Sequence, residues 1–149
     1  MGNLGFQELL LLAFVLVFMV TVILFLITLQ NTLKAVEPEN RTMNPGNVWL
    51  MLIPFFNAIW VFIVVNAIAN SSQTQLELYG EYSGQKVTYN IGMAWAICSV
   101  LNWVPIIGLI AGFAALILFV VYWIKVNETR KQLLVLKQLH ESREDASIL

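Results

Sequence analysis

The chain has 149 residues, of which 59% are hydrophobic and 11% are charged, and its formal net charge is −1. A soluble domain carries charges on about a quarter of its residues, so this composition excludes an ordinary water-soluble fold. The near-neutral charge provides no basic field for nucleic acid. One cysteine and one histidine exclude an internal disulfide and a typical zinc site.

The first predicted element is a transmembrane helix over residues 5–33. Leu9–Leu29 holds 21 consecutive residues without a charge, and at 1.5 Å per residue these extend about 31 Å, the thickness of a hydrocarbon core. The first residues lack the Lys or Arg that opens a signal peptide, so we expect this helix to stay attached. The polar stretch 34–46 follows, with two prolines and four charges, and predicts a loop in water.

A second helix is predicted over residues 48–70, which carry no charge. Asn47 is a suitable N-cap for it. Pro54 lies in the second turn, where several backbone N–H groups have no helical partner, so we expect a bend there and not a break. Residues 71–86, with two Glu, one Lys and two Gly, predict a second connection at the membrane surface.

Residues 87–124 carry no charge, and as one helix these 38 residues would extend about 57 Å, almost twice what a bilayer hides. A turn is predicted at Asn102, Trp103 and Pro105, because a polar residue, an interfacial aromatic residue and a helix-starting proline meet there. The resulting helices cover 87–101 and 105–126. The charged remainder, 127–149, predicts a helical tail in water after a membrane domain of residues 1–126.

The distribution of Lys and Arg predicts the orientation in the membrane. With four spans and both termini in the cytoplasm, six of the eight Lys and Arg lie inside, and Lys34 and Arg41 lie outside. A three-span alternative, with 87–124 as one kinked element, suits the charges slightly better but leaves roughly 25 Å of apolar helix beyond the bilayer. We therefore expect four spans, a cytoplasmic C-terminus, and Thr42 and Ser142 on opposite sides of the membrane.

A weak internal repeat links the second and fourth predicted helices. Residues 53–57, Ile-Pro-Phe-Phe-Asn, are echoed by residues 104–108, Val-Pro-Ile-Ile-Gly, and each has a Trp shortly upstream. Because both helices run the same way with four spans, this pattern predicts an all-α integral membrane bundle of two hairpins in parallel repeat. The alternative is that Trp and Pro both favour interfacial helix starts.

Residues 44–62, NPGNVWLMLIPFFNAIWVF, resemble a stretch of small, uncharacterised bacterial inner-membrane proteins that are known only as a domain of unknown function. Residues 122–126, YWIKV, are similar to the end of the last helix in those proteins. The resemblance covers about residues 44–127. It implies a multi-pass protein of the bacterial inner membrane with about four helices, and it implies no activity.

The polar side chains of the predicted spans are amides, whereas embedded charges are the usual mark of pumps and proton relays. An asparagine that faces lipid leaves its hydrogen-bonding positions unmade, so these amides should face another helix, a partner subunit or water. We favour hydrogen bonding between helices over binding of a solute. The candidate polar or kink positions are Asn57, Asn66, Asn102, Pro54 and Pro105.

Three small residues on one face of the fourth predicted helix form a candidate packing surface. Gly108 and Gly112 make a small-xxx-small motif, and Ala115 extends the same face. Such a face lets two helices approach closely and gain van der Waals contact. We expect it to pack within the protein, with packing onto a partner as the alternative.

The sequence contains no glycine-rich phosphate loop, no Ser-His-Asp set and no embedded carboxylate pair. It therefore assigns no catalytic, cofactor-binding or metal-binding residue. The first hypothesis is a non-enzymatic accessory or scaffold subunit of a larger inner-membrane complex, in contact with the lipid bilayer and with other membrane proteins or further copies of itself. The alternative is an oligomeric channel or transporter for an unidentified solute, because four spans are few to surround a path alone. A membrane-embedded enzyme has the least support.

Overall fold

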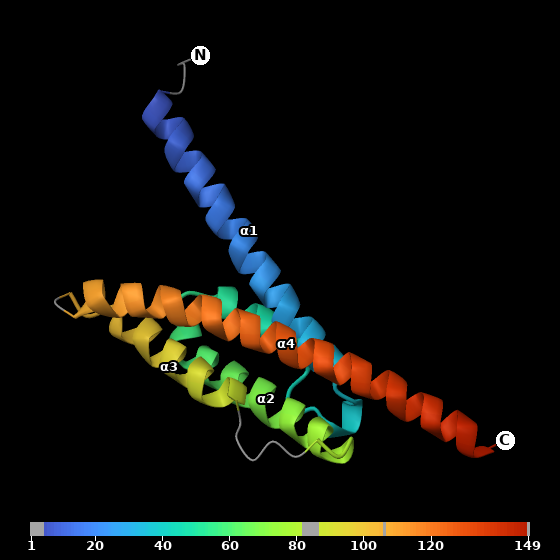
Figure 1. The fold of residues 1–149 in the computed structure, drawn as a ribbon. Helices are drawn as coiled ribbons and strands as arrows, with labels where there is room; N and C mark the ends of the chain where they lie inside the picture. Colours follow the sequence, from blue (N-terminus) through green and yellow to red (C-terminus); the bar gives the residue numbers. More distant parts are fainter. Residues whose placement is uncertain (1–4, 82–86, 106, 149) are drawn as a thin grey trace.

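A computed structural model describes residues 5–81, 87–105 and 107–148. Within these ranges every element is helical, as predicted (Figure 1). Two helices, α1 and α4, are long and apolar enough to cross a membrane, and α3 is a shorter apolar helix. In chain order the elements are α1 (Phe6–Ala35), the 3-10 helices η1 (Pro38–Asn40) and η2 (Pro45–Leu52), α2 (Asn57–Leu78), α3 (Val87–Leu101) and α4 (Gly108–Ile148).

Helix α1 joins the other helices only through its second half. Side chains 6–20 are all exposed, whereas Phe25, Leu26 and Leu29 are buried. Figure 1 shows the first half projecting away from the remaining helices. At the start of α1 the carboxylate of Glu8 accepts a hydrogen bond from the backbone N–H of Gly5 at 3.1 Å, which supplies a partner for a backbone donor at the helix start.

The end of α1 is fixed by an arginine from the segment that follows. The Arg41 guanidinium donates to the backbone oxygen of Val36 at 2.8 Å and to that of Lys34 at 3.1 Å. These carbonyls have no partner within the helix, and a cation there is also favoured by the helix dipole. Arg41 thereby folds residues 36–44, which we call the strap, back against the end of α1.

The predicted second helix, 48–70, is not a single helix. Residues 45–52 form η2, the chain reverses over residues 53–56, and α2 begins at Asn57. Pro54 lacks a backbone N–H and disfavours helical geometry in the residue before it. Phe55 then adopts a φ of 64°, a left-handed conformation that cannot continue the helix. The expected bend at Pro54 is therefore wrong, and the helix is broken there.

The helix start expected at Asn47 also differs. The side chain of Asn44 accepts a hydrogen bond from the N–H of Gly46 at 3.0 Å, and Pro45 occupies the first turn of η2. This N-cap opens η2 three residues before the predicted one, because Asn44 is followed by a proline that suits the first position of a helix.

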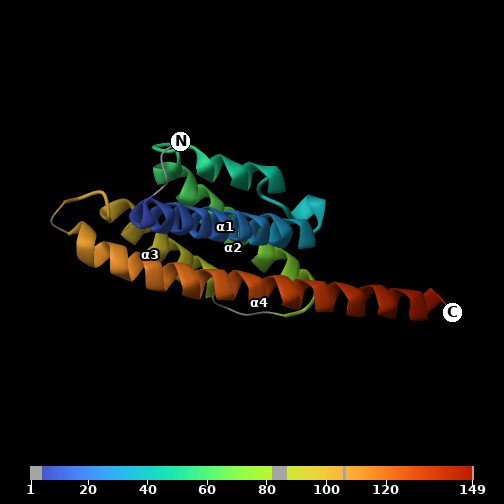
Figure 2. The same cartoon turned by 90° about the horizontal axis from the view of Figure 1, so that it is seen from above.

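Two helical hairpins, η2 with α2 and α3 with α4, point their turns toward the same end of the molecule (Figure 2). We call residues 53–56 and 102–105 the hairpin tips. The ring centroids of Phe55 and Trp103, one from each tip, lie 5.6 Å apart. Helices α2 and α4 run in the same direction, as the repeat predicts, but α1 is not part of either hairpin. Pro54 and Pro105 lie in the turns, and not in the second turn and at the first residue of a helix, as the sequence predicts.

The ends of α1 and α2 meet the middle of α4 at the opposite end of the molecule. Val36 and Leu133 are buried together, with Leu76 packed against them, and the rings of Tyr79 and His140 lie 5.5 Å apart. The strap and the tail of α4 therefore occupy the same end (Figure 2). The four-span prediction placed them apart, because it treated residues 48–70 as a full crossing.

An aromatic cluster holds α1, α3 and α4 together. Phe25 of α1 lies 5.4 Å from Trp95 of α3 and 4.7 Å from Phe119 of α4, measured between ring centroids. The indole N–H of Trp123 donates to the hydroxyl of Thr28 at 3.0 Å, which satisfies two polar groups inside an apolar contact.

Helix α4 continues without interruption through the segment predicted as a tail, as far as Ile148. The pairs Lys125–Glu128 and Lys137–Glu141 lie 2.9 and 4.0 Å apart on its exposed surface. Exposed pairs at these spacings contribute only about 0.2–0.5 kcal/mol each. The first turns of the tail are held instead by burial of Leu133.

Candidate functional site

A cleft of about 720 Å³ lies between the middle of α1, α4 and the hairpin tips. Its volume falls within the range of small-molecule pockets. Most of its wall is apolar. Phe14, Phe18 and Val22 line it from α1, and Leu116 and Phe119 line it from α4.

Four polar side chains also line this cleft, and two of them bond within their own helices. The hydroxyl of Thr21 donates to the backbone oxygen of Val17, and that of Ser99 donates to the backbone oxygen of Trp95, both at 2.8 Å. The other two are the amides of Asn57 and Asn102. The side-chain amides of Asn57 and Asn102 form no hydrogen bond with any residue that the structure describes.

The predicted glycine face of α4 lies against the end of α3. A Cβ atom added to Gly108 would lie 2.6 Å from the backbone oxygen of Asn102, and one added to Gly112 would lie 2.8 Å from its Oδ1 atom. Ala115 is partly buried against the core. This face therefore lets α3 and α4 approach closely within one chain, and it holds the Asn102 side chain at the cleft.

The remaining predicted positions do not join one site. Asn66 is exposed on α2, and its Oδ1 atom accepts a hydrogen bond from the amide of Asn70 at 3.1 Å. Pro54 and Pro105 lie in the two hairpin tips. The structure thus brings Asn57 and Asn102 to a common cleft and leaves Asn66 outside it.

Sequence reasoning missed a buried glutamine that holds the strap. Gln75 is fully buried, and its Oε1 atom accepts hydrogen bonds from the N–H of Glu37 and from the amide of Asn40, both at 3.0 Å. One turn earlier, Ser71 accepts from the N–H of Thr42 at 2.9 Å. The signal was the spacing of Ser71 and Gln75, four residues apart on one helix face, in a stretch that was assigned to a connection.

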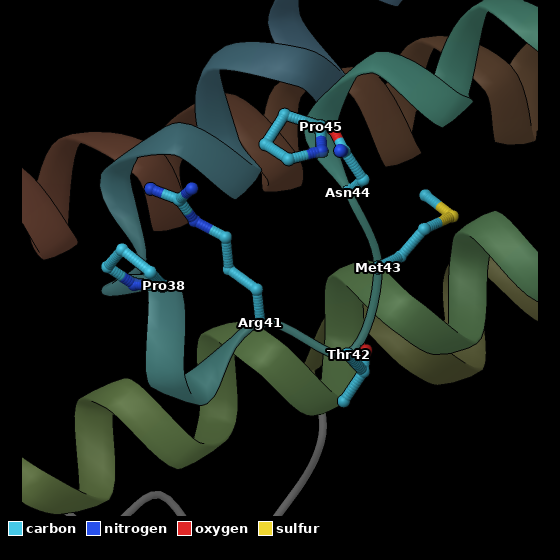
Figure 3. A pocket seen from close by; sticks show the side chains of 6 residues that line it. All are labelled: Pro38, Arg41, Thr42, Met43, Asn44 and Pro45. Atoms are coloured by element: carbon cyan, nitrogen blue, oxygen red, sulfur yellow. The ribbon is translucent and has the colours of Figure 1, made fainter.

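A second hollow of about 330 Å³ lies at the strap, lined by Pro38, Arg41, Thr42, Met43, Asn44 and Pro45 (Figure 3). Its polar groups already have partners. Arg41 binds the carbonyls at the end of α1, Thr42 binds Ser71 and the backbone oxygen of Ala67, and Asn44 caps η2. This hollow therefore reflects how the strap is tied down, and we do not assign it a ligand.

Tyr79 links the strap to the tail of α4. Its hydroxyl donates to the carboxylate of Glu37 across 3.4 Å, and its ring contacts His140. Burial raises the pKa of the Tyr79 phenol, and the nearby negative charge of Glu37 raises it further. The phenol thus remains a neutral donor well above neutral pH, which keeps this contact intact.

A second missed residue is Gly92 of α3. A Cβ atom there would lie 2.5 Å from the ring of Tyr122 and 2.7 Å from the side chain of Val65. Gly92 therefore lets α3 pack between α4 and α2. Gly92 and the fully buried Ala96 form a small-xxx-small pair, which is the signal that points to this contact.

Within the described ranges no group of three or more His, Cys, Asp or Glu residues is placed to hold a metal ion. Comparison with protein-family models, with curated proteins and with solved structures finds no match.

Proposed function

We propose that this chain is a non-enzymatic accessory or scaffold subunit of a larger bacterial inner-membrane complex. The observation that carries the proposal is the first half of α1, whose side chains 6–20 are all exposed and nearly all apolar. A helix that is apolar around its whole circumference is surrounded by lipid or by other apolar helices. Because its own chain leaves it uncovered, α1 offers a long surface to a partner helix.

The chemistry of the cleft also favours a non-enzymatic role. Among the described residues its lining contains no titratable side chain, so these residues offer no general acid, general base or charged nucleophile. In the described ranges the charged residues, apart from Glu8, lie in and next to the strap, at and just after the end of α2, and in α4 from Lys125 onward. They are therefore remote from the hairpin tips.

The positions of the cations support an orientation in the membrane. The described Lys and Arg lie at Lys34, in the strap, and in α4 from Lys125 onward, and these segments meet at one end of the molecule (Figure 2). By the positive-inside rule this end is cytoplasmic. We propose that α1 crosses the membrane, and that the two hairpins, η2 with α2 and α3 with α4, both enter and leave on the cytoplasmic side, because their tips lie together.

The residues that flank the non-helical tip of the η2–α2 hairpin line a cavity. Backbone without regular hydrogen bonding is tolerated at membrane depth only where protein covers it or where it faces a cavity. Leu52 and Asn57, on either side of the first tip, both line the cleft. The indole N–H groups of Trp49 and Trp60 add hydrogen bonds to Gln30 of α1 and to the backbone oxygen of Asn47.

The accessory role is tested by photo-crosslinking in cells, followed by mild detergent extraction and mass spectrometry. A photoreactive residue at Leu11 of α1 should crosslink to one other membrane protein in a defined ratio. The same residue at Ile110 of α4 is the matched control, because the two side chains are similarly exposed, at 68% and 76%. Crosslinking of Leu11 to lipid alone, together with a purified protein that carries no partner, would contradict the accessory role.

The alternative, an oligomeric channel or transporter, has one observation in its favour, namely the two amides in the cleft. Liposomes that contain only this protein should not move protons or inorganic ions, since the described spans hold no buried charge to bind or relay them. Ion flux that depends on the protein and is abolished by Asn57→Leu would replace the accessory proposal with this one.

A further inference from the structure

We propose that the cleft at the hairpin tips binds a neutral lipid of the acylglycerol type, with its acyl chain against α1 and α4 and its head group at Asn57 and Asn102. This site goes beyond the accessory role and does not depend on it. The inference rests on three properties of the cleft. Its wall is apolar, the side-chain amides of Asn57 and Asn102 have no partner among the described residues, and no described residue of the lining is charged.

The apolar wall suits a hydrocarbon chain. Phe14, Val17 and Phe18 lie on one side, and Leu116 and Phe119 lie on the other. The cleft has room for about 720 Å³, as much as a typical pocket for a drug-sized ligand. An acyl chain in this space would cover aromatic surface that the splayed first half of α1 leaves open.

The two amides require a polar group. Asn57 and Asn102 each present donors and acceptors to the cleft, and neither has a hydrogen-bond partner in the part of the chain that the structure describes. At membrane depth, water is scarce and unmade hydrogen bonds are costly. A hydroxyl can donate to the amide oxygens and accept from the amide N–H groups, whereas an ester carbonyl can only accept. A glycerol ester therefore supplies both kinds of partner, where the two hairpin tips meet.

The absence of charge decides between classes of amphiphile. No acidic or basic side chain of the described ranges lines the cleft, so a phosphate or a free carboxylate would be held there without a counterion, which is strongly unfavourable. An uncharged glycerol head group with a single acyl chain avoids that cost. The chemistry therefore favours a monoacylglycerol over a phospholipid or an ionised fatty acid.

The binding experiment uses the purified full-length protein in lipid nanodiscs. A monoacylglycerol that carries a dibrominated acyl chain is added, and quenching of tryptophan fluorescence is measured, because Trp95 and Trp103 both line the cleft. Quenching should saturate. Asn57→Leu should weaken the apparent affinity by about tenfold, as expected when a ligand loses a hydrogen bond to the amide, whereas Asn66→Leu, which changes an amide outside the cleft, should leave it unchanged.

Two comparisons separate a specific site from general solvation by lipid. Dibrominated phosphatidylglycerol, and dibrominated fatty acid at a pH where it is ionised, should quench without saturation and equally in all variants. Ala115→Phe, which fills the cleft from α4, should abolish saturable quenching and provides a second variant that does not alter the amides. Equal quenching by all three lipids, or an affinity that is the same in Asn57→Leu and in the unchanged protein, would overturn the proposal.

Discussion

The buried amide of Gln75 is one of the groups that hold the strap, together with Arg41 and Ser71. Its oxygen accepts two hydrogen bonds from the strap, while its Nε2 atom finds no partner within the described residues. A buried polar atom without a partner costs stability, so the glutamine stabilises the protein only through the contacts of its oxygen. A mutation of Gln75 therefore measures how much the two hydrogen bonds to its oxygen stabilise the protein.

Replacing Gln75 with Leu should lower the free energy of unfolding by about 1–3 kcal/mol, because the N–H of Glu37 and the amide of Asn40 would both lose their acceptor in a buried setting. Thermal unfolding in detergent measures the change, and limited proteolysis should cut the strap faster. Thr74→Ala, on the exposed neighbouring face, is the control and should shift stability by less than about 0.5 kcal/mol. Equal unfolding temperatures for the two variants would remove Gln75 from this role.

Sequence alone identified several side chains of the cleft but not their relations. Asn57 and Asn102 were selected because an amide in an apolar run needs a partner, and that argument requires no structure. Gln75 was missed because it follows the apolar run 48–70 and was treated as part of a connection. Which amide meets another helix depends on how the chain folds back at residues 53–56, and no local pattern specified that reversal.

At the scale of elements, the contact between α3 and α4 depends on two glycines that are not equivalent. A Cβ atom at Gly108 meets a backbone oxygen, which is fixed, whereas one at Gly112 meets the end of the Asn102 side chain, which can rotate away. The two positions therefore differ in how their neighbours can respond. Exchanging a helical glycine for alanine also favours the helix by up to about 1 kcal/mol, which opposes the steric cost.

Gly108→Ala should therefore destabilise the protein by about 1–3 kcal/mol through overpacking, while Gly112→Ala should be close to neutral. Thermal unfolding of the two variants side by side checks this order. Leu109→Phe, at an outward position with 75% exposure, is the control and should leave stability unchanged. If Gly112→Ala proved the more damaging of the two, the α3–α4 contact would differ from the one described here.

The elements also show where a charge-free run is ambiguous. The prediction for 87–101 matches α3 because its length and the turn residues after it both limit the helix. The run 48–70 is long enough to cross a bilayer once. A run of the same length can also form one arm of a hairpin, the turn, and the first part of the second arm. Pro54 was the residue that could have revealed the break. The prediction considered only the backbone N–H that proline lacks. It did not consider that proline also disfavours helical φ and ψ angles at Ile53, the residue before it.

At the scale of the whole molecule, one hairpin changes the arrangement of every connection. If residues 48–70 crossed the membrane, the strap and the tail of α4 would lie on opposite sides. Since η2 and α2 instead return to the end they started from, the strap, the end of α2 and the tail gather together. The Lys and Arg residues of the described ranges then lie at a single end. Helix length and charge distribution therefore favour the same arrangement, whereas in the sequence they favoured different ones.

The last prediction tests this arrangement by cysteine labelling in a background where Cys98 is replaced by alanine. Thr42→Cys and Ser142→Cys should react with a membrane-impermeant maleimide from the same, cytoplasmic side, because the strap and the tail meet at one end of the molecule. Gln7→Cys, at the start of α1, should react from the other side, since a 30-residue helix extends about 45 Å and passes fully through a bilayer. Labelling of Thr42→Cys and Ser142→Cys from opposite sides would restore four crossings and exclude the re-entrant hairpin. Labelling of all three positions from one side would show that α1 does not cross, and the first half of α1 would then lie along the membrane surface.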